Sequence, residues 1–144
     1  TTDFIFGPST ALFENCEIRS KTNSYVTAAS TPEDIAVGYV FKNCKLTANP
    51  GVDKVYLGRP WRPYAATVFI NCEMGKHIRP EGWHNWGKEE NEKTARYAEY
   101  NSTGEGAAAA GRVKWAKQLT KKEAAQYDDL NYIYRMCSDW KPEN

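Results

Sequence analysis

The chain has 144 residues, of which 41% are hydrophobic and 13% aromatic, a composition that supports one domain with a real core and argues against disorder. Its formal charge is +1, so we expect no basic surface that recruits nucleic acid and no acidic tail. No apolar run reaches the roughly 18 residues needed to span a membrane, so we expect a soluble protein without a membrane partner.

The chain opens on a short β-prone segment, D-F-I-F-G at residues 3–7. Asp3 begins this segment, and a carboxylate beside so much apolar surface is costly unless it is paired or exposed. The first residues lack the basic start and apolar core of a signal peptide. Because a strand-like run begins at the first residues, we expect the sequence to be part of a longer chain.

A pattern F-x-N-C-x-apolar occurs three times, at residues 13–18, 41–46 and 69–74, and its cysteines at positions 16, 44 and 72 are equally spaced. Each copy offers two β-prone runs hinged at an asparagine, a residue that tolerates the left-handed backbone of a sharp turn. Repeats of this size cannot bury their apolar face alone and usually stack as solenoids. The pattern therefore predicts a parallel β-solenoid with ladders of Phe, Asn and Cys. A β-sandwich with chance similarity between hairpins is the alternative.

The four cysteines contain no C-x-x-C pair, which argues against a structural zinc site. We expect them mainly as small buried hydrophobic residues, although an extracellular protein could pair two of them.

A second notable segment is L-G-R-P-W at residues 57–61, where Gly58 and Pro60 fix the backbone on either side of Arg59. The number of residues from Asp3 to Arg59 is twice the number from one repeat cysteine to the next. In such a solenoid both side chains are expected on one lateral face, and an arginine can span a coil spacing of about 4.8 Å. From the spacing alone, a structural ion pair and an active-site pair both remain open.

The repeat pattern is lost after residue 77, and the end of the chain carries a helix signal. Thr120 and Glu123 have the spacing of a capping box. The apolar residues that follow suit one face of a helix of about three to four turns: Ala124, Ala125, Tyr127, Leu130 and Tyr134. We expect one domain over residues 1–144, with coils at 1–77, loop-rich wrapping at 78–118, and a helix and tail at 119–144.

Five segments resemble, in this order and at similar spacing, the second half of pectin methylesterases. They are D-F-I-F-G at 3–7, L-G-R-P-W at 57–61, G-W-H-N-W at 82–86, Y-A-E-Y-N-S-T-G at 97–104 and R-V-K-W at 112–115. The resemblance runs nearly end to end, and the first two segments are specific together. It implies an all-β, right-handed parallel β-helix and a carbohydrate esterase that uses no metal and no organic cofactor. Pro8 departs from the small or polar residue frequent in the family, and we expect it to alter only the local turn.

The resemblance also implies roles for individual residues. Asp3 matches the nucleophile that attacks the methyl-ester carbonyl, and Arg59 matches the arginine that binds and orients it. A two-pronged guanidinium favours the ionised carboxylate and fixes which oxygen attacks. The family's acid/base aspartate and oxyanion-stabilising glutamines belong to motifs upstream of D-F-I-F-G, and none is found here. The resemblance thus covers only half of the catalytic machinery, and we expect the chain alone to be inactive.

Aromatic residues are expected to bind the sugar. Trp61 matches a tryptophan that lines the family's substrate groove, Trp83 looks like a second, and Phe6 is expected to flank the same cleft, because an indole face can stack on a sugar ring. For Trp86 and Trp115 a structural role is favoured.

Three other functions compete with this one. Residues 7–11, G-P-S-T-A, faintly resemble a serine nucleophile elbow, but the last glycine and the following helix are missing. Some parallel β-helices hydrolyse polysaccharide chains with paired carboxylates, which fits the Asp, Arg and Trp pattern less well. A noncatalytic polysaccharide-binding solenoid would keep Trp61 and Trp83 but have no turnover.

The substrate that the resemblance implies is pectin, the methyl-esterified homogalacturonan. Because pectin is an extracellular polymer, a secreted or periplasmic protein is expected. An exposed solenoid end favours pairing with other strands, so self-association through that end is a further expectation.

Overall fold

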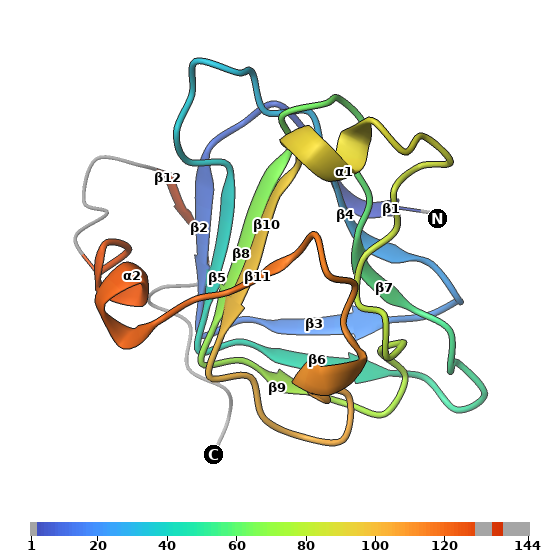
Figure 1. Ribbon diagram of the computed structural model, residues 1–144. Helices are drawn as coiled ribbons and strands as arrows, with labels where there is room; N and C mark the ends of the chain where they lie inside the picture. The colour runs from blue at the N-terminus through green and yellow to red at the C-terminus, as the bar shows by residue number, and fades with distance from the viewer. Residues whose placement is uncertain (1–2, 129–133, 137–144) are drawn as a thin grey trace.

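The computed structural model describes residues 3–128 and 134–136, and it is a parallel β-helix of about three turns, as the repeat predicted. Three sheets form the sides of a prism around one core (Figure 1). Sheet A contains β1 (Asp3–Gly7), β4 (Tyr25–Ala29) and β7 (Tyr56–Gly58). Sheet B contains, in order, β11 (Lys117–Gln118), β10 (Arg96–Tyr100), β8 (Ala66–Ile70), β5 (Tyr39–Lys42), β2 (Ala11–Glu14) and β12 (Tyr134–Met136). Sheet C contains β3 (Glu17–Ser20), β6 (Lys45–Ala48) and β9 (Glu73–Met74).

The corner between sheets B and C is made by asparagines with left-handed backbone. Asn15, Asn43 and Asn71 have φ of 60°, 56° and 55°. A fourth asparagine, Asn101 at φ 55°, follows β10 in the same way, and its amide donates to the Asn71 side chain over 2.8 Å. The asparagine ladder is therefore present, but it extends one coil further than expected. Residues 96–101 belong to a further coil, because β10 pairs in parallel with β8, so the region expected to be loop-rich wrapping, 78–118, also contains a strand of the solenoid.

The core is filled by the repeated aromatic and sulfur side chains. The ring of Phe41 is stacked between those of Phe13 and Phe69, with centroids 4.7 and 4.5 Å apart. Cys44 and Cys72 are buried free thiols, and Cys16 is disulfide-bonded. Parallel pairing in register places identical side chains directly over one another, which explains why the sequence repeats them.

Coil length differs between the sheets. In sheet B, Ala11, Tyr39 and Thr67 are in register and share the constant spacing of the repeat cysteines. In sheet A, the coil from Asp3 to its partner Tyr25 is shorter than that spacing, and the coil from Tyr25 to its partner Tyr56 is longer. Most of the difference lies in the connections between sheets A and B, which are 8–10 in the first coil and 30–38 in the second. The rest lies in the connections between sheets C and A, at 21–24 and 49–55.

The helices are short. They are α1 (Asn91–Thr94), the 3-10 turn η1 (Ala109–Gly111) and α2 (Lys121–Ala125). The capping box of Thr120 and Glu123 is present, but α2 ends at Ala125, so the expected three to four turns were wrong. Tyr134 instead joins β12, where its backbone pairs with the edge of β2, and Leu130 lies outside the described residues. Within the described parts of the chain, no helix has the length and apolar character to cross a membrane.

A buried ion pair ties the later loops to the coils. Arg112 donates from Nε to Glu99 Oε2 over 2.7 Å, and both side chains are 2% exposed. Its Nη2 also donates to the carbonyl of Gly106 over 2.8 Å, and Ser102 donates to Glu99 Oε1 over 2.9 Å. These bonds satisfy both charges in the interior.

Candidate active site

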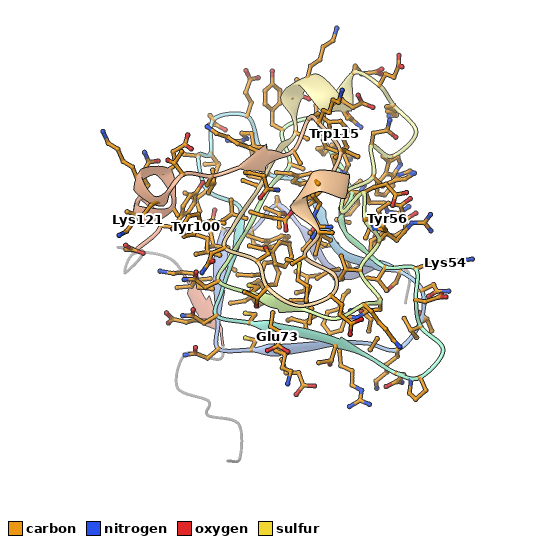
Figure 2. The ribbon with its side chains drawn as sticks, turned by 60° about the horizontal axis from the view of Figure 1, so that its bottom comes forward. Lys54, Tyr56, Glu73, Tyr100, Trp115 and Lys121 are labelled. Atoms are coloured by element: carbon orange, nitrogen blue, oxygen red, sulfur yellow. The ribbon has the colours of Figure 1, made fainter. Side chains whose placement is uncertain are left out.

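The outer face of sheet A carries a column of side chains in register. Asp3 on β1 pairs with Tyr25 on β4, and Tyr25 pairs with Tyr56 on β7. The rings of Tyr25 and Tyr56 are stacked, with centroids 5.3 Å apart. Figure 2 shows Tyr56 on a different side of the molecule from Glu73 of sheet C and Tyr100 of sheet B.

Asp3 and Arg59 meet at this column. Nε of Arg59 lies 3.0 Å from Oδ1 of Asp3, and Nη2 lies 3.0 Å from Oδ2, which is a two-pronged ion pair. Both side chains are 19% exposed. The backbone N–H of Arg59 donates to the carbonyl of Thr27 over 3.1 Å, so the segment after β7 continues along β4. The structure thus brings together the two residues singled out as nucleophile and partner.

The guanidinium of Arg59 lies between two aromatic rings. Its Cζ is 4.0 Å from the ring centroid of Tyr25 and 3.9 Å from that of Trp86. Neither ring was predicted as part of the site. Trp86 was assigned a structural role, and nothing in the sequence marked Tyr25, because its alignment with Asp3 depends on a coil shorter than the repeat.

His84 packs against the same column. Its ring meets Tyr25 and Tyr56 edge-on, at centroid distances of 5.9 and 5.2 Å. Its Nδ1 accepts a hydrogen bond from the backbone N–H of Trp86 over 3.0 Å. Burial lowers the pKa of His84, and the positive charges of Arg59 and Arg79 lower it further. The neutral imidazole is therefore the form that fits this site.

Phe6 and Trp61 form an exposed aromatic pair beside the ion pair. Their ring centroids are 6.0 Å apart, and they are 62% and 40% exposed. The backbone N–H of Trp61 donates to the carbonyl of Ala29 over 2.9 Å, which places Trp61 further along sheet A than Arg59. The guanidinium of Arg62 lies 5.6 Å from the Trp61 ring. Both aromatic side chains are available to a ligand on the face that carries Asp3.

Trp83 lies elsewhere. It is 1% exposed, and its ring is stacked on Tyr97 at 4.2 Å and tilted against Phe69 at 5.8 Å in the core. A ring covered by protein has no face left for a sugar, so the expected substrate contact of Trp83 is contradicted. Trp83 also lies against Gly58, where an added Cβ would be 3.0 Å from its ring and 2.3 Å from Thr27 Oγ1. The absence of a side chain at Gly58 therefore lets Trp83 and Thr27 pack closely against the backbone next to Arg59.

No metal centre is present in the part of the chain that the structure describes: nowhere do three His, Cys, Asp or Glu side chains gather in a geometry that could hold an ion. The chemistry available on this face is that of a fixed carboxylate, a planar cation and exposed aromatic rings.

Comparison with known proteins gives one family. The family model described as pectinesterase matches residues 1–136. Among curated proteins, pectinesterase 31 from Arabidopsis thaliana is 42% identical over 132 residues, covering 91% of this chain. Among solved structures, the pectin methylesterase from carrot has a TM-score of 0.78 at 33% identity over 87% of this chain. A pectin methylesterase in complex with a hexasaccharide has a TM-score of 0.77 at 31% identity over 98% of this chain.

The matches also show how much of these proteins is represented. The chain spans 42% of the Arabidopsis protein, 44% of the carrot structure and 48% of the hexasaccharide complex. It therefore corresponds to less than half the length of each.

Proposed function

Because the chain belongs to the pectinesterase family, we propose that it forms part of a pectin methylesterase, which hydrolyses the methyl esters of polygalacturonate to carboxylates and methanol. The observation that carries this proposal is the two-pronged pair of Asp3 and Arg59 beside the exposed rings of Phe6 and Trp61. The pair supplies a fixed carboxylate, and the rings supply a surface on which a sugar can stack.

Asp3 is the proposed nucleophile. One of its carboxylate oxygens attacks the ester carbonyl carbon, the bond to the methoxy oxygen breaks, and methanol leaves with a proton from a general acid. Water then attacks the resulting anhydride and gives a proton to the general acid, which now acts as a base, so that the galacturonate carboxylate is freed and Asp3 is restored. Arg59 holds the Asp3 carboxylate in one orientation through its two hydrogen bonds.

The general acid and the groups that stabilise the tetrahedral oxyanion have no counterpart among the motifs of this chain. We propose that they come from sequence outside it, since the chain spans less than half of its relatives. The chain alone is then expected to release no methanol.

The proposed substrate is methyl-esterified homogalacturonan. Two observations support it: a structural relative is described as a complex with a hexasaccharide, and the exposed pair of Phe6 and Trp61 lies beside Asp3. Such a substrate is met outside the cytoplasm, which supports a secreted or periplasmic location. Association of two chains through the end of the solenoid that carries β1 and β3 remains a prediction for sedimentation measurements.

The second candidate is a noncatalytic polysaccharide-binding solenoid, which the exposed Trp61 alone would support. The Asp3→Asn substitution separates the two functions. In an esterase it abolishes methanol release and leaves sugar binding nearly intact, whereas a binding module has no activity to lose.

The deciding experiment measures methanol release from highly methylated pectin. Three proteins are compared. They are this chain, a longer protein in which the upstream half of the enzyme is restored to this chain, and the longer protein with Asp3→Asn. We expect activity only in the unsubstituted longer protein. No methanol from it at any pH would exclude the esterase and favour the binding module.

A further inference from the structure

The aromatic rings on either side of Arg59 form a clamp, which we define as Tyr25 and Trp86. Cζ of Arg59 is 4.0 Å from one ring centroid and 3.9 Å from the other. The two rings occupy the faces of the guanidinium, and its Nε and Nη2 edge points at Asp3. An arginine held on both faces and along one edge has few other orientations available.

Each ring of the clamp is held by contacts that do not involve Arg59. Tyr25 lies on β4, is stacked on Tyr56 at 5.3 Å, and meets His84 edge-on. Its place is therefore set by the sheet register.

Trp86 is held by a chain of turn hydrogen bonds. Its N–H donates to His84 Nδ1 over 3.0 Å, and Gly87 N–H donates to Asn85 Oδ1 over 2.8 Å. The Asn85 amide donates to Glu92 over 2.9 Å, which ties the turn to α1.

Trp86 also has φ of 63°, an unfavourable value for a bulky residue. Such backbone persists only where surrounding contacts impose it, and it is frequent at functional sites. Here it directs a half-buried indole onto Arg59.

We propose that Trp86 is a positioning residue for ester hydrolysis, acting with Tyr25 to hold the guanidinium of Arg59 in the orientation that fixes Asp3. The proposal rests on the proposed function, because the reaction is that of the whole esterase. It assigns Trp86 a role through Arg59, and it leaves contact with the sugar to Phe6 and Trp61.

The clamp and the aromatic pair should have different kinetic effects. Loss of Trp86 frees Arg59 to turn away from Asp3, so fewer bound substrates face a correctly oriented carboxylate, and kcat falls. The strength of one cation–π contact corresponds to a decrease of about tenfold. Loss of Trp61 removes a sugar contact and mainly raises KM.

The first measurement is made on this chain and needs no activity. The order parameter of the Arg59 Nε–H bond, from nitrogen-15 relaxation, is expected near the rigid value of about 0.85. In Trp86→Leu it should fall below about 0.6, and Trp86→Phe should keep most of the rigidity. Nε of Arg112, bonded to Glu99 in the core, is the internal control for an intact fold. An unchanged Arg59 value in Trp86→Leu overturns the clamp.

The second measurement is made on the longer, active protein. Trp86→Leu should lower kcat about tenfold and change KM less than about threefold, with most of the activity restored by Trp86→Phe. Trp61→Leu is the matched control and should change mainly KM. If Trp86→Leu raises KM and leaves kcat unchanged, Trp86 is a sugar contact and the proposal is wrong. If the unsubstituted protein releases no methanol, the proposed function fails, and the relaxation data alone decide whether Trp86 holds Arg59.

Discussion

Arg59 bonds Asp3 across an intervening strand. The residue in register with Asp3 two coils further on is Tyr56, three positions before Arg59, so the arginine reaches back past Tyr25 of β4 to the carboxylate. The pair therefore joins β1 to the segment after β7, which do not pair directly.

This geometry predicts that lysine cannot replace Arg59. Arg59→Lys keeps the charge but loses one hydrogen bond to Asp3 and the flat faces that the clamp holds. We expect methanol release by the longer protein to fall by about 100-fold in kcat/KM, the equivalent of about 3 kcal/mol. Arg19→Lys, on the exposed side of sheet C, is the control and should keep activity. Activity of Arg59→Lys near that of the control would remove Arg59 from the mechanism.

His84 predicts an acid limit to activity. Its pKa lies below the ordinary 6.5 because of burial and the charges of Arg59 and Arg79. As the pH falls through that lowered pKa, the protonated ring can no longer accept the Trp86 N–H, and a cation appears beside Arg59. We expect kcat for methanol release by the longer protein to decline as the pH falls through the pKa of His84.

The matched variant is His84→Asn, which retains a side-chain acceptor two residues before Trp86 but does not titrate. Its acid limit should move to lower pH, toward the range in which carboxylates protonate. Identical pH profiles for the two proteins would contradict the role of His84.

His77 predicts a pH dependence of stability. It is 3% exposed, its Nε2 has no hydrogen-bond partner among the described residues, and burial lowers its pKa. The unfolded chain binds the proton at higher pH than the folded chain. The contribution of neutral His77 to the free energy of unfolding is therefore fully present above its pKa in the unfolded chain, about 6.5. It is lost as the pH falls through the lower pKa of the folded chain. Urea unfolding of His77→Gln should show a smaller loss between about pH 7.5 and pH 5. An equal loss in both proteins would mean that a group other than His77 causes the pH dependence of stability.

The asparagine corners predict a selective tolerance of glycine. Asn43 has φ of 56°. In a left-handed backbone the Cβ of alanine lies too close to the following carbonyl, which costs about 1 kcal/mol. Alanine also lacks the side chain with which asparagine can form local hydrogen bonds that offset this cost. Glycine has no such penalty. In urea unfolding we expect Asn43→Ala to be less stable than Asn43→Gly. The reverse order would show that the side chain, and not the backbone conformation, selects asparagine there.

The buried pair of Glu99 and Arg112 predicts a large loss of stability. Glu99→Ala leaves a 2% exposed guanidinium without its counter-ion, which costs about 3 to 5 kcal/mol of unfolding free energy. Glu17→Ala, which removes an exposed acceptor from Thr47, should cost less than about 1 kcal/mol. Calorimetry of both variants tests the contrast, and similar melting temperatures would mean that the buried pair contributes little.

The solenoid could be predicted because Phe recurs at a constant spacing in sheet B, with Asn and Cys at the corner that follows it, and the coils are of equal length there. The same period placed Asp3 and Arg59 on one face, although the coils of sheet A do not follow it and the residue in register with Asp3 is Tyr56. The end of α2 was not predictable, since a capping box marks where a helix begins and not where it stops.

The two tryptophans of residues 82–86 show why the site was only partly predicted. Both lie in one short segment. The family resemblance implied a sugar contact for Trp83, and a structural role was favoured for Trp86. The bridge between Gly58 and Trp83 directs Trp83 into the core, and the left-handed turn directs Trp86 to Arg59. Neither the bridge nor the turn leaves a pattern that hydrophobic periodicity can detect.

The unequal coils of sheet A have a consequence for how related sequences can diverge. Insertions and deletions in the connections on either side of sheet A, such as 30–38 and 49–55, change the number of residues between Asp3 and Arg59 without moving β1 or β7. Sheet B, with its stacked rings of Phe13, Phe41 and Phe69, allows no such change within its strands, because one residue more would turn a ring outward. Sequence length is therefore expected to vary among relatives at the two corners of the prism that flank sheet A, while the distance between Asp3 and Arg59 stays unchanged.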